Sequence, residues 1–192
     1  MPAGGRRHDS IEDNREIIYH TNRRIRRMFR VTSTIDPLYG SCQWIAAAML
    51  IHIEDGKEAR AMMDRLHSSP DDFNWKMMYK GNLNLSEMLQ RNTKYSLMKI
   101  HLGVCGKERN YIDFLFKEAT GKYVCLLQDN NYTERHAVGI DCSSIPKLIW
   151  DCAECEAILL SRENLDRCTG ENTSCMSIKT VGEIVLKNNR KK

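Results

Sequence analysis

Apolar residues run without interruption from Trp44 to Ile51, directly after a short turn at Gly40 and Ser41. The run is rich in Ala, Met and Leu, which favour helix, and it contains neither Gly nor Pro. Because it is apolar on every side, it is typical of a helix buried in the centre of a domain. The pattern therefore predicts a central helix that has Cys42 in its first turn.

Short β-type stretches bounded by polar turns follow in the second half of the chain. Three of them predict an antiparallel meander that packs on the central helix: 122–128, 134–141 and 147–152. The second and third are joined by the polar turn 142–146. Outside the meander we expect strands at 95–102 and 157–160, and a strand or a helix at 176–187.

Helical spacing of apolar residues appears on both sides of the central helix. After it, a helix over 57–66, an aromatic-rich segment over 73–79 and a short helix over 83–89 form a helical insertion. Before it, residues 10–30 predict a helix with acidic residues early and arginines late, an order that suits the helix dipole. A further helix is expected over 107–117.

Composition and charge narrow the class of protein. The chain has 192 residues, of which 42% are hydrophobic and 28% charged, with a net charge of +4. These values are typical of one globular domain with a substantial core. No apolar run reaches membrane-spanning length, and the first residues lack the apolar core of a signal peptide. Eight cysteines without such a signal indicate reduced thiols, so we expect an intracellular protein, cytoplasmic or nuclear, without a membrane partner.

Three residues on the predicted elements make a candidate catalytic group. Unpaired backbone N–H groups and the helix dipole stabilise a thiolate at a helix start, which suits Cys42 to act as a nucleophile. If Asp141 pairs near Lys147, Asp151 lies opposite or diagonal to His136 across the hairpin, within about 5–8 Å. Asp141 is on the same strand as His136 at an odd offset and faces the other way. We therefore expect Asp151 to orient the imidazole.

This order of residues resembles the papain-like cysteine peptidase superfamily. Members of that superfamily place Cys at the start of a central helix, and His and then Asp or Asn on successive strands of an antiparallel sheet. Segment 40–46 resembles the papain-type nucleophile segment. His136 followed by an apolar strand and then by Asp151 is similar to the bacteriocin-leader peptidases. The layout is also similar to ovarian-tumour-type and Josephin-type deubiquitinases.

The resemblance implies an α+β, papain-like fold, with the central nucleophile helix packed on an antiparallel sheet, an N-terminal helix and a helical insertion. It implies a single catalytic domain at 31–186, which the charge pattern flanks with a basic arm and helix at 1–30 and a basic tail at 187–192. The implied activity is thiol-dependent cleavage of a peptide or isopeptide bond, with ubiquitin-like conjugates among the candidate substrates. The implied partner is a protein or peptide substrate, and neither a metal nor an organic cofactor is needed.

The oxyanion donor departs from the family pattern. Papain-like enzymes often supply a Gln side chain a few residues before the cysteine, whereas this chain has Asp36 six positions before Cys42. An ionised Asp36 side chain has no proton to donate to an oxyanion, although the Asp36 backbone N–H could donate one. Gln43 is a nearby amide candidate, and Trp75 in the insertion is a candidate substrate contact. Among these donors we favour the backbone N–H of Cys42.

Other functions stay open at this point. The departure at Asp36 is consistent with an inactive papain-like module that only binds protein. The basic helix at 10–30 is consistent with nucleic-acid binding, and clustered cysteines downstream suggest a zinc-dependent version of it. The cysteines concerned are Cys152, Cys155, Cys168 and Cys175. His101 on the predicted strand 95–102 is a second candidate histidine, but no well-placed carboxylate follows it.

Overall fold

The computed structural model describes residues 41–68, 85–102, 110–129, 135–152, 156–168 and 176–187. Its helices are α2 (Ser41–His52), α3 (Gly56–Ser68), α5 (Leu85–Asn92), α6 (Tyr111–Lys117) and α7 (Arg162–Arg167). Its strands are β1 (Tyr95–Lys99), β2 (Lys122–Asp129), β3 (Arg135–Asp141), β4 (Leu148–Asp151), β5 (Glu156–Leu159) and β6 (Met176–Leu186). The strands form one antiparallel sheet in the order β1-β6-β2-β3-β4-β5.

The predicted α+β fold, with a central helix packed on an antiparallel sheet, is confirmed. The predicted meander is β2-β3-β4, and the central helix α2 begins at Ser41, so Cys42 lies in its first turn. The last segment, for which the sequence allowed either a strand or a helix, is strand β6. It lies between β1 and β2 and pairs with both, which joins β1 to the meander.

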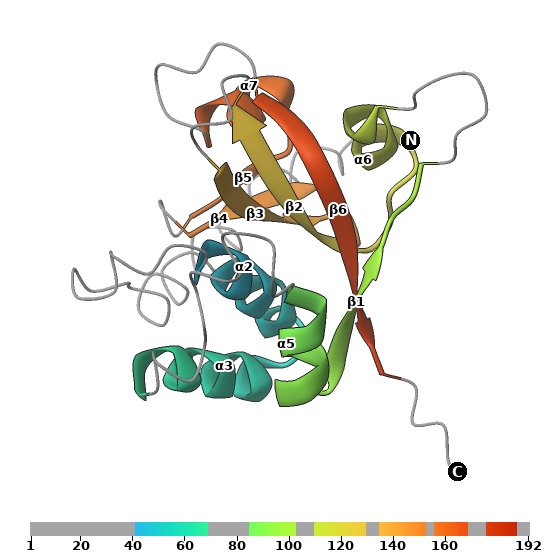
Figure 1. Cartoon of the computed structure of the whole chain (residues 1–192). Helices are drawn as coiled ribbons and strands as arrows, with labels where there is room; N and C mark the ends of the chain where they lie inside the picture. The colour runs from blue at the N-terminus through green and yellow to red at the C-terminus, as the bar shows by residue number, and fades with distance from the viewer. Residues whose placement is uncertain are drawn as a thin grey trace, which may run out of the picture.

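Two hydrophobic cores cover the two faces of the sheet (Figure 1). Helices α2, α3 and α5 pack on one face, where Val124 and Ala137 of the sheet belong to the first core. Helices α6 and α7 pack on the other face, where Val138 and Ile140 belong to the second core. Because both faces are covered, the middle of β3, residues 137–140, is apolar on both sides of the strand.

Helix α2 is the most deeply buried element of the first core. Every residue from Trp44 to Ile51 is at most 2% exposed. The Trp44 indole N–H donates a hydrogen bond of 2.9 Å to the Met62 carbonyl, which ties α2 to α3. On its other side α2 touches the backbone of β3 at Gly139, where a Cβ would lie 2.8 Å from Leu50 Cγ. The absence of a side chain at Gly139 thus sets the approach of α2 to the sheet.

Several predicted features lie outside the described residues. They are the basic helix at 10–30, Asp36, the aromatic segment 73–79 with Trp75, and residues 107–109 at the start of the helix predicted over 107–117. Within the described ranges, no helix combines the length and the apolar character that crossing a membrane requires.

Candidate active site

The hairpin of β3 and β4 brings His136 and Asp151 to the same side of the sheet. The strands pair Asp141 with Leu148 and Gly139 with Trp150. Continued by one step, this register puts Asp151 opposite the residue two positions from His136, so the two side chains are diagonal neighbours on one face. They lie at the end of the hairpin away from its turn, and the pairing follows from the length of that turn.

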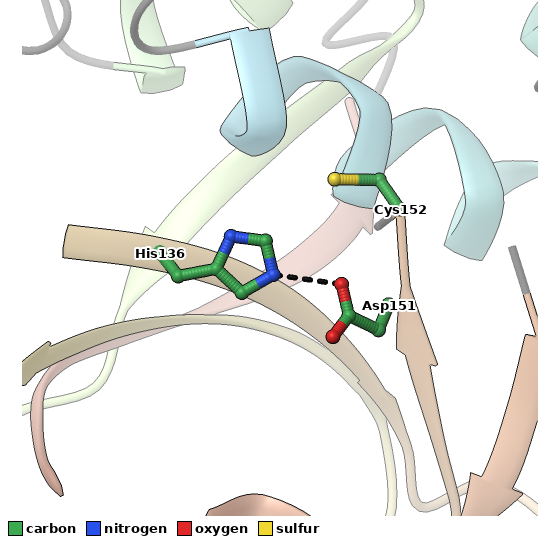
Figure 2. A group of neighbouring side chains, drawn as sticks. All are labelled: His136, Asp151 and Cys152. Carbon is green, nitrogen blue, oxygen red and sulfur yellow. Dashed lines mark hydrogen bonds and ion pairs between the residues drawn. The ribbon is translucent and has the colours of Figure 1, made fainter. Parts of the chain in front are cut away.

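A short hydrogen bond joins the two side chains. His136 Nε2 lies 2.7 Å from Asp151 Oδ1 (Figure 2). The Asp151 side chain is only 2% exposed, whereas that of His136 is 20% exposed. A buried carboxylate without a charged partner would be costly, so the imidazole N–H compensates its loss of water. Nε2 is therefore the donor to Asp151, and Nδ1 remains for another partner.

The second partner of the imidazole is Cys42. Cys42 is close enough to the His136 ring to contribute to the raised pKa of the imidazole. Helix α2 packs on β3 at Gly139, through Ala46 and Leu50, which lie one and two turns after Cys42 on the helix. The first turn of α2 thus lies over the start of β3, and Cys42 is partly exposed there.

The charges around His136 favour its protonated form. Burial, the largest influence, acts to lower the pKa of His136, but the hydrogen bonds and negative charges of Asp151 and Cys42 oppose it. Their combined effect raises the pKa of His136 from 6.5 to about 10. At neutral pH the ring is therefore an imidazolium that can donate a hydrogen bond from each nitrogen.

Asp141, the other acidic residue that follows His136, is engaged elsewhere. Its side chain is buried and accepts hydrogen bonds at Oδ1 from the backbone N–H of Ser143, at 2.9 Å, and from the Ser143 hydroxyl. This arrangement holds the start of the turn between β3 and β4. The structure therefore brings Asp151, and not Asp141, to the imidazole, as expected from the alternation of side chains along a strand.

Cys152 also lies beside His136 and Asp151, a position that the sequence did not predict. Its Sγ, a ring nitrogen of His136 and a carboxylate oxygen of Asp151 all lie within 4.8 Å of one another (Figure 2). Cys152 directly follows Asp151 at the end of β4 and is partly exposed. Strand alternation would have turned it to the opposite face, and only the end of the strand at Asp151 lets it turn toward the imidazole.

The cysteines considered as zinc ligands are not brought together as a set. Cys152 packs beside the first core, whereas Cys168 is buried in the second core next to α7. Among the described residues, the candidate metal group that contains Cys152 consists of His136, Asp151 and Cys152 and does not include Cys168. Cys155 and Cys175 lie outside the described residues.

The remaining candidates are placed as follows. Gln43 is half-buried and lines a cavity against the sheet whose lining residues do not include Cys42, His136 or Asp151. His101 is exposed just beyond β1, and β6 and β2 separate that strand from β3. Asp36 and Trp75 belong to the ranges that are not described. The catalytic roles of Cys42, His136 and Asp151 stay a prediction, now with their contacts known.

Comparison with solved structures finds a similarity to the Pseudomonas avirulence protein AvrPphB. The match has a TM-score of 0.43 and 14% sequence identity, and it covers 76% of this chain and 91% of that chain. No protein-family model and no curated protein matches the sequence. At this level of similarity, any functional assignment depends on the side chains themselves.

Proposed function

We propose that this chain is a thiol hydrolase of the papain-like type, with Cys42 as nucleophile, His136 as general acid and base, and Asp151 as the orienting residue. One observation carries the proposal: a single imidazole is held between a buried carboxylate at 2.7 Å and the thiol in the first turn of a buried helix. A nucleophile, its base and an orienting group in contact are the signature of covalent catalysis.

The resting state in this mechanism is an ion pair of the Cys42 thiolate and the His136 imidazolium. The raised pKa of His136 supports it, because the ring stays protonated at neutral pH. The thiolate sulfur attacks the carbonyl carbon of the substrate and forms a C–S bond, and negative charge moves to the carbonyl oxygen. The backbone N–H of Cys42, at the positive end of α2, is the proposed donor to that oxygen.

Collapse of this intermediate breaks the C–N bond, and His136 gives its proton to the leaving amine. An acyl-thioester on Cys42 remains. The neutral imidazole then takes a proton from water, whose oxygen attacks the thioester carbon and releases a carboxylic acid. The thiolate and the imidazolium are restored, so protons balance over the cycle.

Asp151 keeps the ring in place through both steps. Its carboxylate accepts the Nε2 hydrogen bond whether the ring is neutral or charged, which leaves Nδ1 for the thiol and the leaving group. The proposed substrate is a protein or peptide bond or an isopeptide bond, with ubiquitin-like conjugates as the finer alternative. An intracellular, reducing setting is part of the proposal, because the nucleophile must stay a free thiol.

A panel of activity probes tests the proposal. The purified full chain is incubated with vinyl-sulfone peptides and with ubiquitin-like proteins that carry a carboxy-terminal electrophile, and adducts are read by intact mass and peptide mapping. We expect a single adduct on Cys42, lost in Cys42→Ala and strongly slowed in His136→Gln. Reaction with peptide probes alone would restrict the substrate to peptides.

The inactive binding module gives a different result in the same experiment. In that case ubiquitin-like or peptide probes bind without forming an adduct, and Cys42→Ala binds as the wild-type chain does. A thiol that reacts no faster than a free cysteine, with no turnover of peptide substrates, would contradict the proposed hydrolase.

A further inference from the structure

A cavity of about 370 Å³ opens beside the start of α2, on the face of the sheet that α2 and α5 cover. The first residues of α5 and the strands β1, β2 and β6 form it. Leu85, Leu97, Val124 and Leu126 provide apolar walls. Gly182 belongs to the same lining, and a Cβ there would meet side-chain atoms of Leu97 at under 3 Å, so the Leu97 side chain lies directly over Gly182.

The cavity lies close to the proposed catalytic group on two sides. Gln43, which lines it, directly follows Cys42 on α2. Leu126, which also lines it, pairs across the sheet with Ala137, the residue after His136. A peptide whose scissile bond lies at Cys42 therefore needs only a short length of chain to put a neighbouring side chain into the cavity.

Lys99 is the charged residue among the lining residues. It is exposed at the end of β1, and its ammonium has no ion-pair partner in the described part of the chain. Other lysines of the fold are engaged: Lys122 pairs with Glu54, and Lys147 donates to the Leu115 carbonyl at 2.7 Å. An ammonium that no carboxylate of the described residues neutralises, beside apolar walls, complements a ligand that carries both a carboxylate and apolar groups.

We propose that this cavity is a specificity site for an acidic residue of the substrate. The carboxylate of that residue pairs with the Lys99 ammonium. Its methylene groups and an adjacent apolar residue of the substrate contact Leu97 and Leu126. The inference rests on the proposed hydrolase for its relation to cleavage, but the binding chemistry belongs to the cavity itself. Lys99 is a specificity residue in this view and takes no part in bond breaking.

Profiling with a random peptide library tests the preference. Wild-type protein should cleave peptides that carry Glu or Asp at one fixed position from the broken bond over peptides that carry Lys or Arg there. The wild-type protein should prefer the acidic peptides by about three- to thirtyfold, and the charge reversal Lys99→Glu should prefer the basic peptides by a similar factor. The matched control is Lys57→Glu, an exposed lysine on α3 outside the cavity, which should leave the ratio unchanged.

Binding to the inactive variant separates this proposal from the proposed activity. Cys42→Ala protein is titrated with acetyl-Leu-Glu-Leu-amide and acetyl-Leu-Lys-Leu-amide while backbone amide NMR signals are followed. The Glu peptide should shift the signals of Val124 and Leu126, the Lys peptide should not, and Lys99→Glu should exchange the two results. If these shifts occur but the wild-type protein cleaves no peptide, the proposed hydrolase activity is contradicted and the proposed specificity site is supported. Equal or absent shifts with both peptides would overturn the site whether or not the protein cleaves peptides.

Discussion

His136 and Asp151 are in hydrogen-bond contact at 2.7 Å although they lie 15 residues apart, because the β3–β4 hairpin returns the chain beside its own start. The carboxylate is almost completely buried, so its charge acts on the imidazole through little solvent. This contact is one of the main reasons that the pKa of His136 is raised to about 10. Changing Asp151 should therefore alter both the rate and its dependence on pH.

The variant Asp151→Asn should lower kcat by about 10²–10⁴-fold, since an amide can hold the imidazole in the wrong tautomer. Losing the carboxylate also removes a charge that favours the imidazolium, so the pKa of His136 falls. The loss of activity at alkaline pH should then move toward neutral pH. A pH profile of kcat/KM for both proteins measures this shift.

Asp141→Asn is the matched control for that experiment, because Asp141 is also buried on the same hairpin but serves the turn. The amide oxygen of Asn can still accept from the Ser143 backbone N–H. We expect unchanged kinetics and an unchanged pH profile. If Asp141→Asn moved the alkaline limb as far as Asp151→Asn does, the assignment of Asp151 would be wrong.

Stability should depend on pH through the same imidazole. The folded pKa of His136, about 10, is above the unfolded value of 6.5, so protonation favours the folded state. This contribution is fully present below about pH 6.5 and disappears as pH rises toward 10. Urea unfolding at several pH values, in wild type and His136→Gln, should give stability curves that converge with rising pH. Curves that stay parallel would exclude this linkage.

Thiol labelling should distinguish Cys42 from the other described cysteines. Cys125 and Cys142 are buried, and burial raises the pKa of each thiol, to about 11 for Cys142. Cys152 is the main competitor, because it is partly exposed and lies near the same imidazole. Iodoacetamide near neutral pH should modify Cys42 first and Cys152 next, as read by peptide mapping.

Cys152→Ser is the control for the labelling experiment. It should leave the labelling rate of Cys42 and the turnover of peptide substrates nearly unchanged. Faster labelling of Cys152 than of Cys42 in the wild-type chain would move the nucleophile to the end of β4 and contradict the proposed mechanism.

The contact between His136 and Asp151 was predictable because it depends on local rules. Side chains alternate along a strand, and the length of the turn fixes approximately which residues of a hairpin face each other. The predicted turn was 142–146, whereas the turn between the paired residues Asp141 and Leu148 spans 142–147. The burial of α2 was predictable for a similar reason, since eight successive apolar residues from Trp44 to Ile51 leave no polar face for solvent.

The position of β6 and the orientation of Cys152 depend on long-range structure. Segment 176–187 has no local signal for its two partners, and its pairing with β2 shifts register between Leu126 and Leu127. Cys152 faces the imidazole only because β4 ends at Asp151. The cavity at Lys99 could not be predicted for the same reason, because its lining comes from α2, α5, β1, β2 and β6.

The last prediction concerns Gly139, where α2 touches the sheet. In Gly139→Ala the new Cβ would lie 2.8 Å from Leu50 Cγ and 3.2 Å from the Ala46 carbonyl oxygen. Overpacking of this kind costs about 1–3 kcal/mol, and relief requires α2 to move away from β3. Because Cys42 belongs to α2, the distance between its thiol and the His136 ring should increase. We expect kcat of the folded protein to fall by about tenfold or more, since such misplacements affect the reacting geometry directly.

The control is Gly56→Ala, whose Cβ would have its nearest neighbour, in His52, at 3.7 Å. Both variants are compared by kcat at a temperature where each is fully folded, with thermal unfolding as the stability measure. If Gly139→Ala loses stability but keeps its kcat, the packing of α2 on β3 at Gly139 does not set the distance between the Cys42 thiol and the His136 imidazole.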